Sequence, residues 1–425
     1  MDQFRILGPT VLEGTVRAGG AKNAALPALA ASLLTDRPLT LEGLPRVRDI
    51  ETMRSLLGHL GVASGWTGGT VELTPGGEVP TDDAPYDLVK TMRASVLVLG
   101  PLTARRGHAR VSLPGGCAIG VRPIDQHLAG LEALGARVRL EHGDVETRAD
   151  RLVGTRFRFA MPTVTGTENL LMAATLAAGE TVLENCAREP EIVDLARLLV
   201  AMGARIEGAG SPTIRILGVE ALTGARHRII PDRIEGGTYL IGAALTGGDV
   251  KLTGIDVADL TPLAEVLTGC GAEVECGEGW VRVARQGRLV SRDIVTAPFP
   301  GFPTDLQAQY LALMTAAEGT ATVTETVFEN RMQHVAELAR MGAEIRLEGR
   351  TARVVGPRRL SGAHVMATDL RASACLVLAG LAAEGETLVD RIYHLDRGYE
   401  SMEKKLAALG ARVERQRSGQ EGEKR

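Results

Sequence analysis

The sequence predicts an α/β protein of two domains, each built from three β/α modules of about 70 residues. One observation is a short phrase that recurs six times: an apolar residue, Gly, and then usually Ala, a charged residue and Val or Ile. Its glycines are spaced by 74, 68, 68, 71 and 68 residues, at positions 61, 135, 203, 271, 342 and 410. A second observation is that every interval contains the same order of helix and strand patterns. A third is the composition, with 51 Gly but only 6 Phe, 5 Tyr and 2 Trp in 425 residues, which favours close packing of small side chains.

The first element of each module is a helix that is apolar nearly all round. A helix without a polar face is normally buried on every side, so several modules have to pack together to cover these helices. The six segments are KNAALPALAASLL (22–34), RASVLVLGPL (93–102), ENLLMAATLAA (168–178), TYLIGAAL (238–245), LQAQYLALMTAA (306–317) and RASACLVLAGLAA (371–383).

The remaining elements of a module follow in a fixed order. A β-rich segment such as LTLEGL or TVLEN comes next, and a second, amphipathic helix then ends at the recurring Gly, where we expect a left-handed C-cap. In the third module, Ile192, Ala196, Leu199 and Met202 form the apolar stripe of that helix. A final strand closes the module.

The repeat count also predicts the domain boundary. Three modules make a domain of about 210 residues, which is a plausible size for one core. We expect one domain at 22–229 and a second made of 1–21 together with 230–425. Ligand sites occur preferentially at domain interfaces, so we expect the active site in the cleft between them.

Composition excludes several classes of protein. With 48 basic and 52 acidic residues the net charge is −4, which gives no general attraction to nucleic acid or to an anionic membrane. The five cysteines are scattered without a CxxC pair or a zinc-like His spacing, so we expect free thiols in a reducing cytosol and no metal. The first residues lack the pattern of a signal peptide, and apolar stretches such as 374–383 are shorter than a membrane span. We therefore expect a soluble cytoplasmic protein; the sequence makes no prediction of its oligomeric state.

Charged residues recur where the first helices begin. They are Lys22 and Asn23 in the first module, Arg93 in the second, Asp305 before the fifth helix and Arg371 in the sixth. A helix N-terminus attracts anions, whereas a basic side chain there is unfavourable for the helix itself. The near copies MRAS (92–95) and LRAS (370–373) thus suggest an anion held between the two domains. The alternative is an ordinary surface Arg or an ion pair with a neighbour, such as Asp369 beside Arg371.

The segment LPGGCAIGVRPID (113–125) interrupts the second module with three Gly and two Pro, and we expect it to form a lid-like loop. It carries Cys117 and, five residues later, Arg122. An exposed Cys near Arg can be activated as a nucleophile or an acid, although Pro-Gly-Gly-Cys alone is a weak motif. We expect the other cysteines to be small buried residues: Cys186, Cys270, Cys276 and Cys375.

Asp305 lies in the Pro-rich entry to a helix, FPGFPTDLQAQ, and is open to two interpretations. As an N-cap or first-turn residue it would stabilise the helix by about 1 kcal/mol. As a functional residue it would be a general base that reaches across the cleft. The two interpretations are compatible.

Eight phrases taken together resemble the UDP-N-acetylglucosamine 1-carboxyvinyltransferases, a group of enolpyruvyl transferases with the EPSP synthase-like fold. The resemblance extends from about Phe4 to about Val413 and implies an inside-out α/β barrel of two domains with three modules each. The phrases are GGAKNAALPALAA (19–31), TMRAS (91–95), PGGCAIGVRPID (114–125), NCAREPEIVDLA (185–196), FPTDLQAQ (302–309), ETVFENRMQHV (325–335), DLRAS (369–373) and HLDRGYE (394–400).

The resemblance implies that phosphoenolpyruvate and UDP-N-acetylglucosamine are the substrates, and that the 3-O-enolpyruvyl sugar nucleotide and phosphate are the products. The sugar hydroxyl would add to C2 of phosphoenolpyruvate, giving a tetrahedral ketal that loses phosphate, without a metal or another cofactor. This would be the first committed step of peptidoglycan synthesis. Neither nucleic acid nor a membrane is expected as a partner.

The resemblance also implies roles for individual residues. Cys117 would protonate C3, and Asp305 would accept the proton of the 3-hydroxyl. Lys22, Arg122 and Arg397 would hold the phosphate, with Arg331 and Arg371 near the carboxylate. Further ligand contacts are implied for Asn23, Arg93, Pro123, Ile124, Asp125, Gln126, Thr163, Val164, Thr165, Gly166, Val327 and Asp369.

The chain departs from the pattern of many relatives at two places. Thr163-Val164-Thr165 stands where many relatives have Ser-Val-Gly, and Met161 stands where some have Lys. We expect these two departures to affect the affinity for the nucleotide and not the chemical step. Two alternatives remain open. One is the sister transferase acting on shikimate 3-phosphate, which lacks the Cys-bearing lid and has a Ser-rich motif at the position of Lys22-Asn23-Ala24-Ala25. The other is a non-catalytic paralogue that binds a sugar nucleotide.

Overall fold

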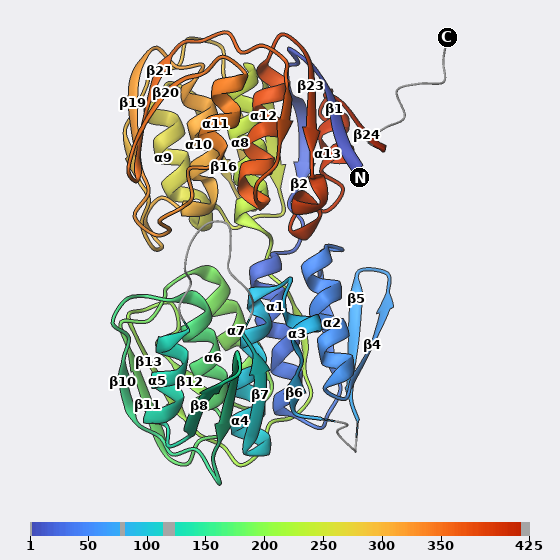
Figure 1. The fold of residues 1–425 in the computed structure, drawn as a ribbon, viewed down its shortest axis with the longest axis vertical. Helices are drawn as coiled ribbons and strands as arrows, with labels where there is room; N and C mark the ends of the chain where they lie inside the picture. The colour runs from blue at the N-terminus through green and yellow to red at the C-terminus, as the bar shows by residue number, and fades with distance from the viewer. Residues whose placement is uncertain (1, 77–80, 114–123, 418–425) are drawn as a thin grey trace. The chain divides into compact units, whose positions relative to one another are not determined.

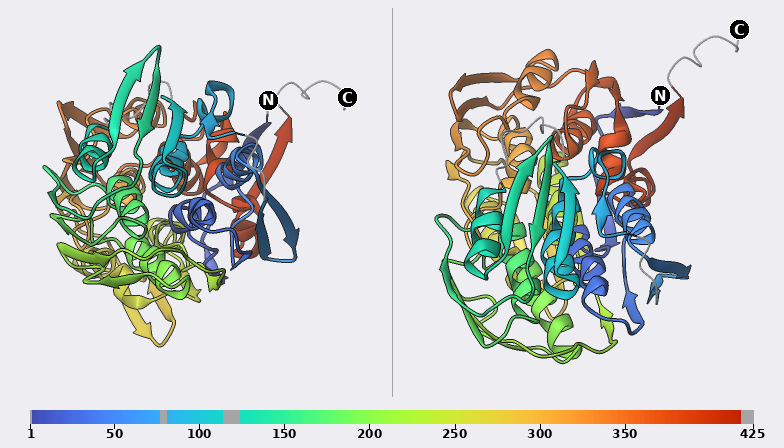
Figure 2. Two further views of the ribbon diagram at one scale, coloured as in Figure 1. Left: turned by 90° about the horizontal axis from the view of Figure 1, so that it is seen from below. Right: turned by 60° about the horizontal axis from the view of Figure 1, so that its bottom comes forward.

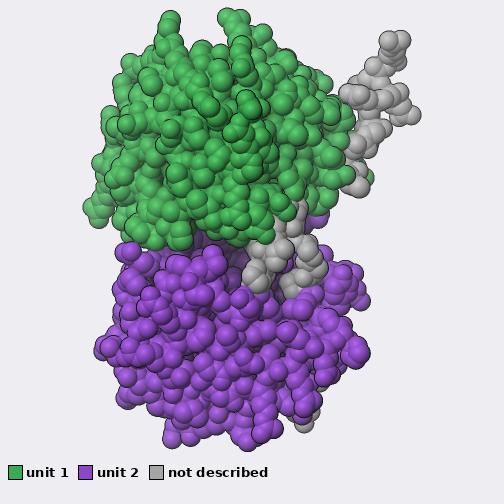
Figure 3. Space-filling view, turned by 60° about the vertical axis from the view of Figure 1, so that its left-hand side comes forward, with its two compact units in different colours: residues 1–19, 117–121, 231–425 green, residues 20–116, 122–230 purple. Residues whose placement is uncertain are grey.

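The structure is a computed structural model, and it describes residues 2–76, 81–113 and 124–417. The chain divides into two compact units (Figure 3). Unit 1 comprises the chain up to Gly19 and from Pro231 onward, and unit 2 comprises the described residues between Gly20 and Ile230. Each unit has its own hydrophobic core, centred on buried Ala, Leu and Val side chains.

Unit 2 contains three modules in sequence. The first consists of α1 (Lys22–Ala30), η1 (Ala31–Leu34), β3 (Leu39–Glu42), α2 (Arg48–His59), β4 (Val62–Thr67) and β5 (Thr70–Pro75). The second consists of β6 (Asp83–Ala84), α3 (Tyr86–Val89), η2 (Arg93–Val98), α4 (Leu99–Arg106), β7 (His108–Ser112), α5 (Asp125–Ala133), β8 (Arg137–Glu141) and β9 (Asp144–Arg148). The third consists of β10 (Arg156–Arg158), α6 (Val164–Ala174), β11 (Glu180–Glu184), α7 (Pro190–Ala201), β12 (Arg205–Glu207) and β13 (Thr213–Leu217), followed by β14 (Arg226–Arg228).

Unit 1 repeats the plan and also includes the beginning of the chain, β1 (Asp2–Gly8) and β2 (Glu13–Arg17). Its first module consists of α8 (Arg233–Thr246), β15 (Asp249–Thr253), η3 (Val257–Leu260), α9 (Thr261–Gly269), β16 (Glu273–Gly277) and β17 (Trp280–Ala284). The next consists of β18 (Ile294–Val295), η4 (Thr304–Leu306), α10 (Gln307–Met314), β19 (Gly319–Thr324), α11 (His334–Arg340), β20 (Glu344–Glu348) and β21 (Thr351–Gly356). The last consists of β22 (His364–Met366), α12 (Leu370–Ala382), β23 (Gly385–Asp390), η5 (Ile392–Arg397), α13 (Met402–Ala408) and β24 (Arg412–Arg417).

All six four-stranded sheets of the described residues share one topology, three sheets in each unit. A central strand such as β11 has a parallel strand on one side and an antiparallel hairpin on the other, in the order β10-β11-β13-β12. In the last module the chain begins and ends in the same sheet, because β1 lies between β23 and β24 and is antiparallel to both. Two strands follow the recurring Gly in the first five modules, where the sequence predicted one. Tight Gly-containing turns, such as the one at Gly68, join strands too short to be separated by pattern alone.

Each unit has its helices inside and its sheets outside, as Figures 1 and 2 show for the strands of unit 2. Helix α6 is buried continuously from Gly166 to Ala174, whereas buried and exposed residues alternate along β5 and β13. This pattern confirms the predicted α/β modules, with the all-apolar first helices at the centre. The described residues contain no helix with the length and apolar character needed to cross a bilayer.

The recurring glycines end the second helices as predicted. All six have positive φ angles, of 90° at Gly61, 95° at Gly135, 104° at Gly203, 93° at Gly271, 95° at Gly342 and 92° at Gly410. Side chains with a Cβ adopt this conformation at a cost, which explains why Gly recurs there. A different need for Gly occurs at Gly100, where an added Cβ would lie 2.3 Å from Oδ1 of Asn169.

Candidate functional site

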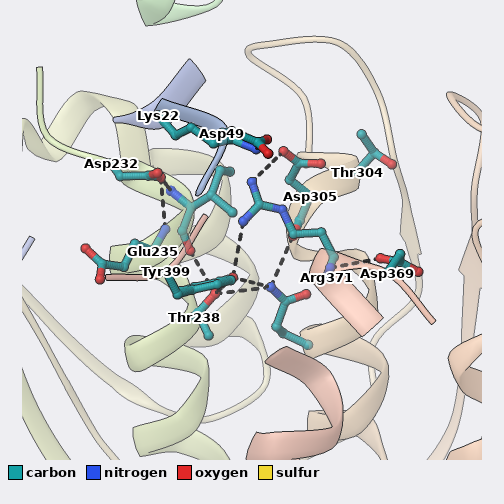
Figure 4. Close-up of polar contacts among 12 residues, drawn as sticks. Lys22, Asp49, Asp232, Glu235, Thr238, Thr304, Asp305, Asp369, Arg371 and Tyr399 are labelled. Carbon is teal, nitrogen blue, oxygen red and sulfur yellow. Dashed lines mark hydrogen bonds and ion pairs between the residues drawn. The ribbon is translucent and has the colours of Figure 1, made fainter. Parts of the chain in front are cut away.

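A buried cluster of charged side chains in unit 1 is built around Asp305 (Figure 4). Its Oδ1 accepts a hydrogen bond from Nη2 of Arg331 at 2.6 Å, and its Oδ2 accepts one from Nη2 of Arg371 at 2.9 Å. The two arginine side chains are only 4% and 5% exposed. The sequence placed Asp305 in the first turn of a helix, and it does lie in the 3-10 turn η4, but no side-chain cap forms there. The carboxylate pairs with two distant arginines instead of with backbone N–H groups.

The N-terminus of α12 places Arg371. Oδ1 of Asp369 accepts hydrogen bonds from the backbone N–H groups of Arg371 and Ala372, at 2.8 and 3.0 Å. Asp369 is therefore the N-cap, and the suggested ion pair between it and the neighbouring Arg371 is not formed, because the Arg371 guanidinium reaches Asp305. The cap leaves the helix start intact despite the basic side chain beside it.

A chain of hydrogen bonds supports Arg371 from the other side. Nη1 of Arg371 donates to the Tyr399 hydroxyl at 3.3 Å, and that hydroxyl lies 2.9 Å from Oγ1 of Thr238. Thr238 in turn donates to the carbonyl of Ile234, so the Tyr399 hydroxyl is the donor to Thr238. Burial raises the pKa of Tyr399, and it stays a neutral phenol. The arginine is thus held by one ionic and one neutral partner.

Thr304 and Glu325 position the second arginine. Nη1 of Arg331 donates to Oγ1 of Thr304 at 2.9 Å, and Thr304 donates to Oε2 of Glu325 at 2.7 Å. The other oxygen of Glu325 accepts from the backbone N–H groups of Val327 and Phe328. This arrangement fixes the loop that carries Arg331, and it leaves Nε of Arg331 buried without a hydrogen-bond partner among the described residues.

The electrostatics of the cluster follow from these contacts. Burial alone would raise the pKa of Asp305, but Arg371 and Arg331 outweigh it and hold the pKa well below its usual range. Asp305 is therefore an ionised carboxylate with both oxygens engaged. Nearby His334 is neutral, because burial lowers its pKa to about 4. Arg397 lies at the end of η5.

In unit 2 the charged residues at the helix starts are arranged differently. Lys22 opens α1, is buried, and donates from Nζ to Oδ2 of Asp49 at 3.0 Å. Asn23 follows it on the same helix. Arg93 opens the 3-10 helix η2 without a side-chain cap, and its Nε and Nη1 are buried with no hydrogen-bond partner in the part of the chain that the structure describes.

A polar network in unit 2 joins α5 and α6. Asn169 accepts from the backbone N–H of Gly100 at 2.7 Å and donates to the carbonyl of Val96 at 3.1 Å, so the orientation of its amide is fixed. Its Nδ2 also lies 2.9 Å from Nδ1 of His127, which must therefore accept, and Nε2 of His127 carries the proton. That proton points to Oγ1 of Thr165 at 3.2 Å.

The network is uncharged at neutral pH. His127 is fully buried, and burial lowers its pKa to about 4. Because Thr165 accepts from His127, its own hydroxyl proton is not used in this contact. Thr165 lies in the first turn of α6, whose N-cap is Thr163; Oγ1 of Thr163 accepts from the Gly166 N–H at 3.3 Å.

Gln126 anchors the segment that leads into α6. Its Oε1 accepts from the backbone N–H of Ala160 at 2.7 Å, and its Nε2 donates to the carbonyl of Met161 at 3.2 Å. Asp125 lies in the first turn of α5, with Ile124 at the N-cap position. Gln126 therefore connects residues 124–126 to the segment just before α6. Residues 163–166, which the resemblance groups with 124–126, form the N-cap and first turn of that helix.

Comparison with known proteins assigns the chain to a family. A sequence model described as EPSP synthase (3-phosphoshikimate 1-carboxyvinyltransferase) matches residues 6–406. The chain is 57% identical over 98% of its length to the UDP-N-acetylglucosamine 1-carboxyvinyltransferase of Koribacter versatilis, of which it covers 96%. It belongs to the EPSP synthase family of enolpyruvyl transferases. It is therefore an enzyme, a transferase.

Solved structures of this family share the fold. The enolpyruvyl transferase NikO from Streptomyces tendae matches with a TM-score of 0.88 and 27% identity, over 97% of this chain and 98% of that one. An EPSP synthase from Acinetobacter baumannii matches with a TM-score of 0.74 and 20% identity, over 98% of this chain and 100% of that one. At 20% identity, the similarity to the Acinetobacter baumannii enzyme is evidence for the fold alone. Both match the two-domain α/β fold expected of an enolpyruvyl transferase.

The cysteines separate into two groups. Cys117, together with Arg122 and Pro123, lies outside the described residues. Cys186, Cys270 and Cys375 are buried as predicted, and burial raises the pKa of each thiol, to about 12 for Cys186. The prediction was wrong for Cys276, which is exposed, because β16 is an edge strand with much of its length in solvent.

The sequence analysis did not single out the residues that support these polar clusters. Tyr399 lies in the phrase HLDRGYE and Glu325 in ETVFENRMQHV, so both were within the quoted motifs, but no role was assigned to either. Asp49 and Asn169 carry no local signal, because their partners come from other helices. In the described residues, no group of three or more His, Cys, Asp and Glu side chains is placed to hold a metal ion.

Proposed function

We propose that this transferase moves the enolpyruvyl group of phosphoenolpyruvate to the 3-hydroxyl of UDP-N-acetylglucosamine and releases phosphate. The 57% identity to a relative named for this activity, across nearly the full length of both chains, carries the proposal. The reaction would be the first committed step of peptidoglycan synthesis and would take place in the cytoplasm.

The Asp305 cluster supports a binding site for the carboxylate of phosphoenolpyruvate. Two buried guanidinium groups, those of Arg331 and Arg371, face a single protein carboxylate, and Arg331 keeps an unused N–H donor. A substrate carboxylate is the chemical group that complements such a pair, because Arg forks bind carboxylates with two parallel hydrogen bonds. Asp305 would then accept the proton of the sugar 3-hydroxyl as its oxygen bonds to C2.

Residues from both units would bind the phosphorylated parts of the substrates. Lys22, with Arg122 and Arg397, would hold the phosphate of phosphoenolpyruvate, and Asn23, Arg93 and Asp369 would help to place the ligands. The start of α6 (Thr163–Gly166) offers backbone N–H groups to the diphosphate, as helix N-termini do for anions. The segment 122–126 and Val327 would hold the rest of the nucleotide.

Cys117 would supply the second proton. In the addition step its thiol proton goes to C3 while the hydroxyl oxygen bonds to C2, which gives the tetrahedral ketal. In the elimination step C3 loses a proton and the C2–O bond to phosphate breaks. Cationic side chains would stabilise the developing negative charge without a metal or other cofactor. The epoxide fosfomycin would alkylate the same thiol.

Phosphate release in the presence of both substrates tests the proposal. Release should depend on phosphoenolpyruvate and UDP-N-acetylglucosamine together and should be absent when shikimate 3-phosphate replaces the sugar nucleotide. Release with shikimate 3-phosphate alone would overturn the proposed substrate, and no release with either acceptor would point to a non-catalytic paralogue. The Cys117→Asp variant should retain turnover and resist fosfomycin, whereas Cys117→Ala should lose nearly all turnover.

A further inference from the structure

The hydrogen bonds of Asp305 conflict with its assignment as a general base. A base needs a lone pair directed at the proton that it removes. Here Oδ1 is occupied by Arg331 at 2.6 Å and Oδ2 by Arg371 at 2.9 Å. The carboxylate is thus held ionised by two charge-assisted hydrogen bonds, and its pKa is well below its usual range because the arginines outweigh the effect of burial. In this arrangement Asp305 is a poor proton acceptor.

The surrounding carboxylates cannot take over the two arginines. Glu325 accepts from the hydroxyls of Thr296 and Thr304 and from two backbone N–H groups. Asp369 caps α12, and Asp232 caps α8 through the N–H groups of Ile234 and Glu235. Asp305 is therefore the one carboxylate that is ion-paired to Arg331 and Arg371 among the described residues.

Two buried cations that share one anion can bind a second anion. Burial of two guanidinium groups with a single carboxylate has an unfavourable desolvation free energy, which a second bound anion would offset. Nε of Arg331 is already buried without a partner in the described chain, so a bidentate contact through that edge is available. An incoming carboxylate would compete with Asp305 for the other donors of the same two side chains.

We propose that Asp305 is the resting counter-ion of Arg331 and Arg371, and that the carboxylate of phosphoenolpyruvate displaces it from them and thereby frees it to act as the base. This inference rests on the proposed function, since it takes that substrate as the displacing anion. The exchange makes proton removal from the sugar depend on the presence of the second substrate. The sugar hydroxyl is then not activated before C2 of phosphoenolpyruvate is in place to receive it.

Binding of phosphoenolpyruvate to the full-length enzyme tests the exchange. All proteins carry Cys117→Ala, which prevents turnover and a covalent adduct, and dissociation constants are measured by calorimetry. Asp305→Asn should bind phosphoenolpyruvate about tenfold more tightly than the parent, which corresponds to about 1.4 kcal/mol. The reason is that the substrate carboxylate then displaces a neutral amide from the arginines and not a charged carboxylate. Vinyl phosphate, which lacks the carboxylate, should gain no affinity from the same substitution.

Asp232→Asn is the matched control. Asp232 also acts electrostatically on Arg371, but its Oδ1 accepts from backbone N–H groups, a contact that Asn preserves. It should change the affinity for phosphoenolpyruvate by less than about threefold, equivalent to about 0.7 kcal/mol.

Three outcomes would contradict the exchange. Equal binding of phosphoenolpyruvate by the parent and Asp305→Asn would show that Asp305 does not compete. An equal gain for phosphoenolpyruvate and vinyl phosphate, or for Asp305→Asn and Asp232→Asn, would show a general effect of charge. If the parent bound no phosphoenolpyruvate, the proposed function itself would fail, and the exchange with it. Should Asp305→Asn not fold, Asp305→Ser, which leaves room for water at the carboxylate position, is measured in the same way.

Discussion

The buried polar clusters of the two units are built from different chemistry. In unit 1, Asp305, Arg331 and Arg371 form a charged group in which both carboxylate oxygens are ion-paired. In unit 2, His127, Asn169 and Thr165 form a neutral group whose amide is held by backbone atoms. The neutral network has its hydrogen bonds in place without a ligand. The charged cluster has two cations and one carboxylate, so an anion that binds there would compete with Asp305 for the arginine donors.

The two copies of the Arg-Ala-Ser phrase show the same contrast on a smaller scale. Asp369, two residues before Arg371, caps the α-helix α12, whereas Thr91 stands at the matching place before Arg93. The chain there forms the 3-10 helix η2, whose N-cap is Met92 and has no side-chain cap. The guanidinium of Arg371 is ion-paired, while Nε and Nη1 of Arg93 have no partner among the described residues. The two copies of the phrase therefore differ both in helix type and in the pairing of the arginine.

Removal of Arg371 should have the largest effect of the changes considered. Arg371→Ala removes the donor to Oδ2 of Asp305 and to the Tyr399 hydroxyl. It should lower the free energy of unfolding by about 3 kcal/mol, because a buried carboxylate oxygen left without its hydrogen bond bears the desolvation penalty of a charged group. Turnover should fall by at least about 100-fold, the usual loss for a preorganised electrostatic contact. Urea unfolding and the phosphate-release assay measure the two effects.

Arg282→Ala provides the control. Arg282 also contacts its partner through two hydrogen bonds, at 2.7 and 2.5 Å from Asp249, but at the surface, with 29% and 46% of the two side chains exposed. Arg282→Ala should lower the free energy of unfolding far less than Arg371→Ala does, because exposed ion pairs contribute little, and it should leave turnover unchanged. Equal losses of stability for Arg282→Ala and Arg371→Ala would contradict the importance assigned to burial.

The neutral cluster should make stability depend on pH. The folded-state pKa of His127 is about 4, below the value of about 6.5 for an unfolded chain. The unfolded chain therefore takes up a proton as the pH falls below about 6.5, while the folded protein does so only near pH 4. The stabilising contribution of neutral His127 is complete above about pH 6.5 and decreases toward pH 4, by about 3 kcal/mol in total.

His127→Gln separates this contribution from other titrating groups. Urea unfolding of both proteins at pH 7 and pH 4.5 gives the difference in stability at each pH. That difference should shrink as the pH falls, because the variant has no proton to take up at this position. His334, also neutral and buried, is present in both proteins and cancels. A difference that stays constant with pH would mean that His127 is not the buried neutral group described.

The sequence predicted the repeated parts of the molecule better than its polar contacts. The six glycines fixed the modules because each reflects a local need for positive φ. The partners of Arg371 could not be predicted, since its neighbour Asp369 was the obvious candidate, whereas Asp305 is 66 residues away. His127 and Asn169, 42 residues apart, gave no local signal for the same reason. The Cys276 error arose from edge-strand exposure, which also depends on packing.

The N-cap of α12 should have a smaller effect than either buried cluster. Asp369→Ala removes an acceptor of two backbone N–H groups and should lower the free energy of unfolding by about 1 kcal/mol. Asp369→Ser, whose hydroxyl can cap the helix, should recover most of that stability. If Ser were no better than Ala, the role of Asp369 in unit 1 would be electrostatic, through its charge near His334, and the contrast with the uncapped start of η2 would lose its basis.

Thr165 is expected to give the smallest effect, and it tests whether the neutral cluster serves the ligand. Thr165→Val keeps the shape of the side chain but removes the hydroxyl that accepts from His127. If the hydroxyl proton is donated to the nucleotide diphosphate, the KM for UDP-N-acetylglucosamine should rise about three- to tenfold, the usual value of one hydrogen bond. The KM for phosphoenolpyruvate should stay the same, because its proposed carboxylate site is in unit 1. An unchanged KM for the sugar nucleotide would mean that the His127 network serves the stability of unit 2 alone.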